Sequence, residues 1–134
     1  VVQRTSSGTR SVVAALRAGA RPVYAASFVV ASASAVAASA GDGVTIISAG
    51  LHGTEPAAED DLTARFIADT IDGSVPDAQT AERIRTCDRA ATLMHAPWAH
   101  PGDVDIAGDL DRYPFAMEAV IDADGRVQLA RSAS

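Results

Sequence analysis

Short runs of β-branched residues alternate with helix-forming segments through the first half of the chain. The runs at Val1–Gln3, Val23–Val29 and Val44–Ser48 have strand composition, and Arg10–Ala18 and Ser32–Ala40 between them are typical of short helices. Parallel neighbouring strands need a crossover of this length, and the crossover is usually a helix. The pattern therefore predicts an α/β fold, with a layered, mostly parallel sheet and crossover helices.

The second half of the chain has a different pattern. It predicts helices over Ala57–Asp72, Asp77–Met94 and Asp103–Asp111, then a C-terminal antiparallel hairpin of Phe115–Ile121 with Arg126–Ala130. The first of these helices has one apolar stripe, which we expect to face the core: Leu62, Phe66, Ile67 and Ile71. We predict a single α/β domain over residues 1–134, because this length suits one core.

Composition and charge exclude several classes of protein. The formal charge is −6 and no basic stripe is present, which argues against a nucleic-acid partner. Cys87 is the only cysteine, which excludes an internal disulfide and favours a reducing cytoplasm. Pro22–Gly41 has no charge, but its alanines and serines are too small and polar for a membrane span. We expect a cytoplasmic protein without a membrane partner.

A hydroxyl-rich glycine turn lies between the first predicted strand and the first predicted helix. Free backbone N–H groups at a helix start, with flanking arginines, bind phosphate or sulfonate groups. The same residues are also typical of a Ser/Thr N-cap that only stabilises the helix. The predicted phosphate-binding and substrate-binding residues are Arg4, Thr5, Ser6, Ser7, Gly8, Thr9 and Arg10.

The third strand-to-helix loop, Gly50–Asp61, is acidic. Glu59, Asp60 and Asp61 either complement the dipole of the helix that they begin or hold a hard cation such as Mg²⁺. His52 lies between two glycines and is either a general acid or a surface residue. Further along, the acidic residues Asp103, Asp105, Asp109 and Asp111 are interpreted as a solvated helix face.

With both loops considered, the chain resembles the 2-phosphosulfolactate phosphatase family. The family's Thr-Thr-Asn-Gly-Thr-Arg turn is similar to Thr5–Arg10, and its Ser-Phe-Leu-Asn-Ala-Ser-Ala segment to Ser27–Ala33. Val44–Asp60 resembles the family's strand and loop that end in Glu-Asp. Asp103–Val104 and Asp111–Pro114 fit a later Asp-Val and Asp-Arg-aromatic-Pro element.

The resemblance implies a Mg²⁺-dependent hydrolase that converts 2-phosphosulfolactate and water to 3-sulfolactate and phosphate, in metabolism connected with coenzyme M. It implies that Arg10 neutralises phosphoryl charge and that Glu59 and Asp60 are metal ligands. Glu59 and His52 become the candidate catalytic residues, with His52 as a proton donor. The expected partner is a small phosphorylated or sulfonated substrate.

The departures from the family favour an alternative, a truncated or degenerate anion-binding or assembly domain without catalysis. Ser7 and Val30 replace family asparagines, Ser48 replaces a cysteine, and the family's Asp-Val-Leu-Arg-Ala and Gly-Phe-Asp segments have no counterpart. We therefore expect the chain to match only the C-terminal portion of the family. A third alternative is a structural homo-oligomer that associates through an uncovered strand.

Overall fold

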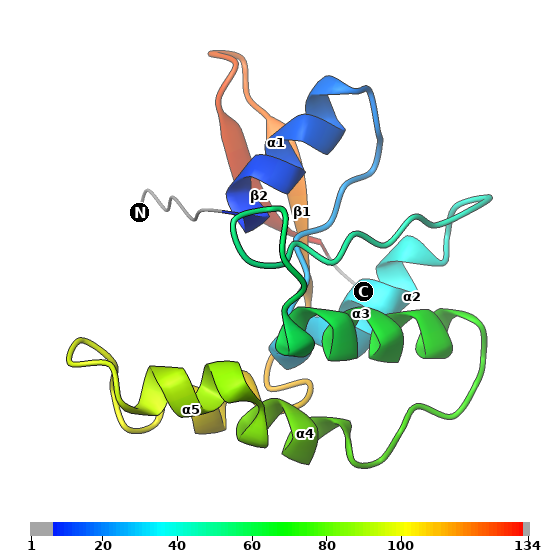
Figure 1. Ribbon diagram of the computed structural model, residues 1–134. Helices are drawn as coiled ribbons and strands as arrows, with labels where there is room; N and C mark the ends of the chain where they lie inside the picture. The colour runs from blue at the N-terminus through cyan, green and yellow to red at the C-terminus, as the bar shows by residue number, and fades with distance from the viewer. Residues whose placement is uncertain (1–6, 133–134) are drawn as a thin grey trace.

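Six α-helices and one β-hairpin form the regular structure of residues 7–132, the part of the chain that the computed structural model describes (Figure 1). A short 3-10 helix, η1 (Phe28–Val30), leads directly into α2. The other elements, in chain order, are α1 (Gly8–Arg17), α2 (Ala31–Ala38), α3 (Ala58–Ile71), α4 (Thr80–Thr86), α5 (Asp88–Met94), α6 (Asp103–Ala107), β1 (Ala116–Ile121) and β2 (Val127–Ser132).

The predicted parallel sheet is wrong. The only sheet in residues 7–132 is the antiparallel pair of β1 and β2, with Ala116 opposite Ser132 and Ile121 opposite Val127. The predicted strand Val44–Ser48 is an irregular exposed segment, and Val1–Gln3 lies outside the described residues. The C-terminal hairpin itself is confirmed.

The predicted strand Val23–Val29 forms no parallel ladder, because its start pairs with the edge of β1 that faces away from β2. This segment runs antiparallel to β1 at its start, through a bridge between Tyr24 and Glu118. The Ala25 amide donates to the Met117 carbonyl at 2.9 Å, and the Ala119 amide donates to the Val23 carbonyl at 2.8 Å. Strand composition indicates a pleated, half-buried surface but does not name the strand's partner.

The predicted helices are present, with two corrections. The long helix predicted over Asp77–Met94 is broken at Cys87, whose extended backbone separates α4 from α5. The Cys87 thiol accepts from the Ala90 amide and caps α5, which offers the backbone an alternative to a continuous helix. The helix predicted over Asp103–Asp111 ends early, at Ala107, with Gly108 as its C-cap.

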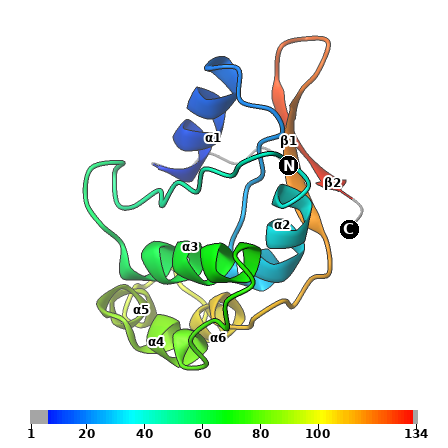
Figure 2. The same ribbon diagram turned by 90° about the vertical axis from the view of Figure 1, so that its right-hand side faces the viewer.

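The core lies between α2, α3 and α4 (Figure 2). Its buried residues are Phe28, Ala31, Ala35, Ile67 and Ile84, and the predicted stripe of α3 packs here as expected. The Phe28 and Phe66 rings meet edge to face, with centroids 5.3 Å apart. The small side chains of Ala31 and Ala35 on α2 leave room for α3 to approach closely.

No helix within residues 7–132 is both long and apolar enough to cross a bilayer. The charge-free stretch Pro22–Gly41 is divided among an extended segment, η1 and α2.

Candidate functional site

Ser7–Arg10, the described part of the predicted anion-binding turn, forms the start of α1. The helix begins at Gly8 and has no acidic residue in its first turn. The first N–H groups of any helix have no acceptor inside the helix, and they lie at the positive end of its dipole. Arg10 is exposed on this turn and forms none of the ion pairs found among the described residues. The helix start itself therefore favours an anion, whereas the neighbouring loop Gly50–Asp61 is acidic.

Ser7 is the N-cap of α1, yet its side chain does not cap the helix. Its exposed fraction is 7%, and its Oγ is buried without a hydrogen-bond partner. A buried hydroxyl without a partner costs stability, so such groups are uncommon and often mark a site for a ligand. Thr9 lies beside it on the helix, whereas Arg4, Thr5 and Ser6 lie outside the described residues.

The acidic loop lies next to this helix start. In both views the connection from α2 to α3 passes beside the first turn of α1 (Figures 1 and 2). The structure thus brings the two predicted loops into one region without a parallel sheet. Their chemical roles, however, differ.

Asp60 and Asp61 hold the loop in place. The Gly50 amide donates to Asp60 Oδ2 at 2.9 Å, and the Ser48 hydroxyl donates to Asp61 Oδ1 at 2.5 Å. The loop closes on itself through Leu51 and Glu55, whose backbone groups pair at 2.8 Å. These two carboxylates therefore have a structural role that the sequence reading did not identify.

Glu59 and His52 have opposite environments. Glu59 Oε2 is buried and has no hydrogen-bond partner, in a side chain that is otherwise half-buried. His52 is exposed, with a positive φ of 55° on the tip of the loop. Among the acidic residues of this loop, Glu59 has a carboxylate oxygen, Oε2, that is buried and accepts no hydrogen bond. His52 has no described partner that would orient it as a proton donor.

A metal centre of several ligands is not formed by the described residues. No group of three or more His, Cys, Asp or Glu side chains within residues 7–132 is placed to hold a metal ion. Mg²⁺ needs only one or two protein carboxylates when water and substrate phosphate complete its shell. Glu59, with its unused oxygen, and the neighbouring Asp60 satisfy that smaller requirement.

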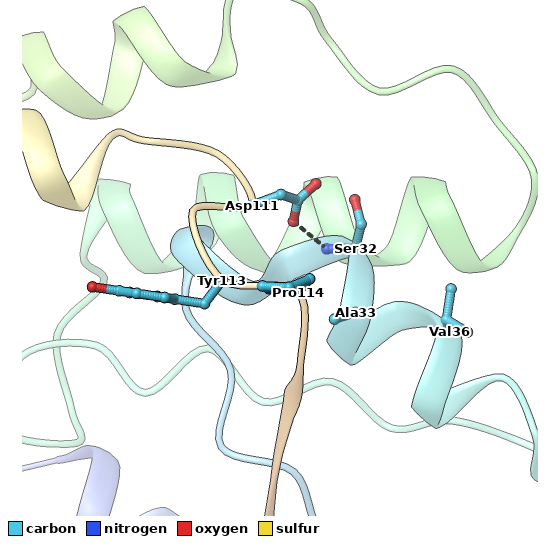
Figure 3. A pocket seen from close by; sticks show the side chains of 6 residues that line it. All are labelled: Ser32, Ala33, Val36, Asp111, Tyr113 and Pro114. Carbon is cyan, nitrogen blue, oxygen red and sulfur yellow. Dashed lines mark hydrogen bonds between the residues drawn. The ribbon is translucent and has the colours of Figure 1, made fainter. Parts of the chain in front are cut away.

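A junction that the sequence reading missed joins α2 to the segment before β1. The Ser32 amide donates to Asp111 Oδ1 at 2.8 Å, so the exposed Asp111 caps α2 and lies beyond the end of α6, not on the predicted helix face (Figure 3). The Asp111 and Tyr113 amides donate to the carbonyls of Phe28 and Val29. Two segments of the family resemblance, Ser27–Ala33 and Asp111–Pro114, thus meet in space.

A hollow of about 240 Å³ lies at this junction, lined by Ser32, Ala33, Val36, Asp111, Tyr113 and Pro114. In Figure 3 the Ser32 hydroxyl and the Asp111 carboxylate lie together, while the Tyr113 ring extends in another direction. The lining has one negative charge and no positive charge. A phosphate or sulfonate is therefore repelled here.

Three charged groups outside these loops have pKa values that their hydrogen bonds shift. The pKa of Asp122 is lowered because its carboxylate accepts from the Arg126 amide and, more weakly, from Gln128 and Asp124. The pKa of Asp77 is lowered by the Gln79 amide and then by Arg83. Tyr113 and Asp109 raise the pKa of Arg112. These groups stabilise turns and are not candidate acids or bases.

Comparison with models of protein families, with characterised proteins and with solved structures finds no match for the chain.

Proposed function

We propose that the chain binds a small phosphorylated or sulfonated anion at the start of α1. The observation on which this proposal rests is Ser7, whose hydroxyl is buried and unpartnered at the N-terminal end of a helix. A phosphoryl or sulfonyl oxygen would accept from this hydroxyl and from the Gly8 and Arg10 amides at the start of α1. Arg10 would add a charge-assisted hydrogen bond from the exposed side.

Binding without catalysis is the form of this proposal that the acidic loop favours. Asp60 and Asp61 already accept hydrogen bonds from Gly50 and Ser48. Recruiting either carboxylate to a metal would compete with a bond that shapes the loop. A binding domain needs no such rearrangement, because its ligand would use donors of α1.

Titration calorimetry with phosphate, sulfate and 3-sulfolactate tests the binding step. Arg10→Ala should weaken the affinity about ten- to a hundredfold, since a hydrogen bond to a charged group contributes about 1.5–3 kcal/mol. Arg17→Ala is the matched control, because Arg17 is exposed at the opposite end of the same helix. Equal affinities of the two variants, or no heat with any of the anions, would reject the assigned site.

Mg²⁺-dependent phosphomonoester hydrolysis is the second candidate, and the buried unpartnered oxygen of Glu59 favours it. The resemblance to 2-phosphosulfolactate phosphatases suggests 2-phosphosulfolactate as substrate. Glu59, assisted by Asp60, would hold Mg²⁺ or orient its water, and the ion would polarise the phosphoryl group. His52 would donate a proton only if substrate draws the loop tip inward.

Release of inorganic phosphate from 2-phosphosulfolactate, with and without Mg²⁺, separates the two candidates. Hydrolysis predicts turnover that requires Mg²⁺ and is abolished in Glu59→Gln. Glu55→Gln is the control, because Glu55 is exposed on the same loop. Binding of 2-phosphosulfolactate without turnover would reject hydrolysis and leave the anion-binding proposal standing.

A further inference from the structure

Three Asp-Gly dipeptides occur in the chain, and each could undergo a spontaneous modification of the backbone. They are Asp42-Gly43, Asp72-Gly73 and Asp124-Gly125. The glycine has no Cβ to shield its backbone nitrogen, so this nitrogen can reach the aspartate side chain. The chain contains no asparagine, so any isoaspartate in it must come from aspartate.

The modification is the conversion of aspartate to isoaspartate. The glycine nitrogen attacks the aspartate Cγ, the N–Cγ bond forms, and the carboxyl OH leaves with the amide hydrogen as water. Water then opens the resulting imide ring at either carbonyl. Opening at Cγ restores aspartate, whereas opening at the other carbonyl gives isoaspartate, whose main chain runs through Cβ and Cγ and is one methylene group longer. No cofactor or reactant other than water is needed.

Hydrogen bonding protects two of the three glycine nitrogens. Exposure does not distinguish the sites, because every residue in the three dipeptides is exposed. The Gly73 amide, however, donates to the Thr70 carbonyl at 3.3 Å at the end of α3. The Gly125 amide donates to the Asp122 carbonyl at 3.0 Å in the hairpin turn. Attack by either nitrogen therefore requires that its hydrogen bond first break by local opening.

Asp42-Gly43 differs because it lies in the irregular connection between α2 and α3 (Figure 1). No backbone N–H from Asp42 to Ala49 donates a hydrogen bond within residues 7–132. A Cβ added at Gly43 would meet nothing within 4 Å, so the space around this glycine is open. The next amide that is held is that of Gly50, which donates to Asp60.

We infer that Asp42 is a site of isoaspartate formation, and that it reacts faster than Asp72 and Asp124. Its attacking nitrogen has no hydrogen bond to break, whereas each of the other two nitrogens must first lose one. A hydrogen bond of ordinary strength corresponds to about a fivefold difference in rate. The product carries its extra methylene group in the connection that leads into the Gly50–Asp61 loop.

Peptide mapping of the folded chain, after incubation for several weeks at mildly acidic pH, tests the inference. Electron-transfer fragmentation identifies which aspartate has become isoaspartate. Isoaspartate should accumulate at Asp42 about fivefold faster than at the other two sites. Gly43→Ala should slow the reaction at Asp42 severalfold, because the added methyl group shields the nitrogen and the open space accommodates it. No isoaspartate at Asp42, equal accumulation at the three sites, or an unchanged rate in Gly43→Ala would overturn the inference.

The same mapping in guanidinium chloride separates the effect of the fold from that of the local sequence. Without backbone hydrogen bonds the three sites should react at similar rates, since they then differ only in the residues that flank them. If Asp42 is preferred to the same extent in the unfolded chain, the sequence and not the fold selects the site, and the inference is rejected.

Discussion

The first turns of α1 and α3 use their backbone and side chains differently. The start of α3 has three acidic residues, and two of them accept hydrogen bonds from the preceding loop. The start of α1 has no acidic residue, and its N-cap serine forms no side-chain cap. Two carboxylates at the start of α3 are thus used by the chain itself, whereas the Ser7 hydroxyl at the start of α1 has no partner.

The start of α2 adds a third arrangement. Its Ser32 amide is satisfied by Asp111, 79 residues further along the chain. At α2 a remote carboxylate accepts from a first-turn amide, whereas the carboxylates at the start of α3 accept from the preceding loop and the first turn of α1 has no acidic residue. The contrast identifies α1 as the helix start to test for ligands.

Gly50→Ala should have the largest effect, because it disturbs the loop held by the start of α3. Gly50 has a φ of 65°, and a Cβ there would collide with the Glu55 carbonyl oxygen. We expect the free energy of unfolding to fall by about 3 kcal/mol, from the left-handed backbone and the clash together. Urea unfolding measures the change.

Gly53→Ala is the matched comparison for that variant. Gly53 also has a positive φ, of 75°, but nothing lies within 4 Å of its would-be Cβ. The expected loss is about 1 kcal/mol, from the backbone conformation alone. If the two alanine variants are equally stable, the close approach of Glu55 to Gly50 does not occur.

Asp111→Ala should have the next largest effect, since it removes the remote cap of α2. Asp111 also has a φ of 53°, a conformation that aspartate tolerates better than alanine. We expect a loss of about 2 kcal/mol in the free energy of unfolding. Asp111→Asn keeps an acceptor oxygen and should lose much less. Equal losses in the two variants would show that the hydrogen bond to Ser32 is unimportant.

Ser7→Ala should change stability little, in contrast to other N-cap substitutions. A serine N-cap usually contributes about 1 kcal/mol, but the Ser7 hydroxyl makes no such bond. We expect unchanged or slightly higher stability, together with weaker phosphate binding. Thermal unfolding and calorimetry on the same preparation measure both effects. A stability loss of about 1 kcal/mol would show that Ser7 caps α1 after all.

The smallest effect is expected on stability in acid, and it comes from Asp122, a carboxylate with a structural role alone. Asp122 accepts backbone hydrogen bonds in the hairpin turn, which lowers its pKa in the folded state. Its contribution is therefore present above the unfolded pKa of about 4 and is lost as the pH falls through the folded pKa. Asp122→Asn should be less stable than the unsubstituted chain near neutral pH. The two unfolding midpoints should converge in acid, and a difference that persists there would contradict this assignment.

The helices and the hairpin could be predicted because their signals are local. Apolar spacing identified α3 and its core-facing stripe, and the Asp-Ala-Asp-Gly turn identified the hairpin. The parallel sheet was wrong because Val23–Val29 and Val44–Ser48 specify strand propensity without specifying a partner. The edge of β1, far along the chain, decides where Val23–Ala25 pairs. The break at Cys87 likewise depends on a side-chain cap that apolar spacing does not reveal.

The start of α1 could be predicted from the sequence, but the roles of the acidic residues could not. The hydroxyls and glycine before Arg10 indicated a helix start, which the structure places at Gly8. Whether Asp60 binds a cation or the Gly50 amide depends on the path of the loop, which composition does not specify. Asp111 was missed because a cap from a distant segment has no local spacing. The sequence signal nearest to this cap was the Arg-Tyr-Pro segment that directly follows Asp111.

The pairing of early segments with late ones has a consequence for synthesis. Val23–Ala25 pairs with β1, and the Ser32 amide needs Asp111 from 79 residues downstream. At a translation rate of about 5–20 residues per second, α2 emerges several seconds before its cap. A nascent chain arrested before Asp111 therefore contains its early helices but not the segment that pairs with them. Chaperones have the largest exposed surface to bind during this interval.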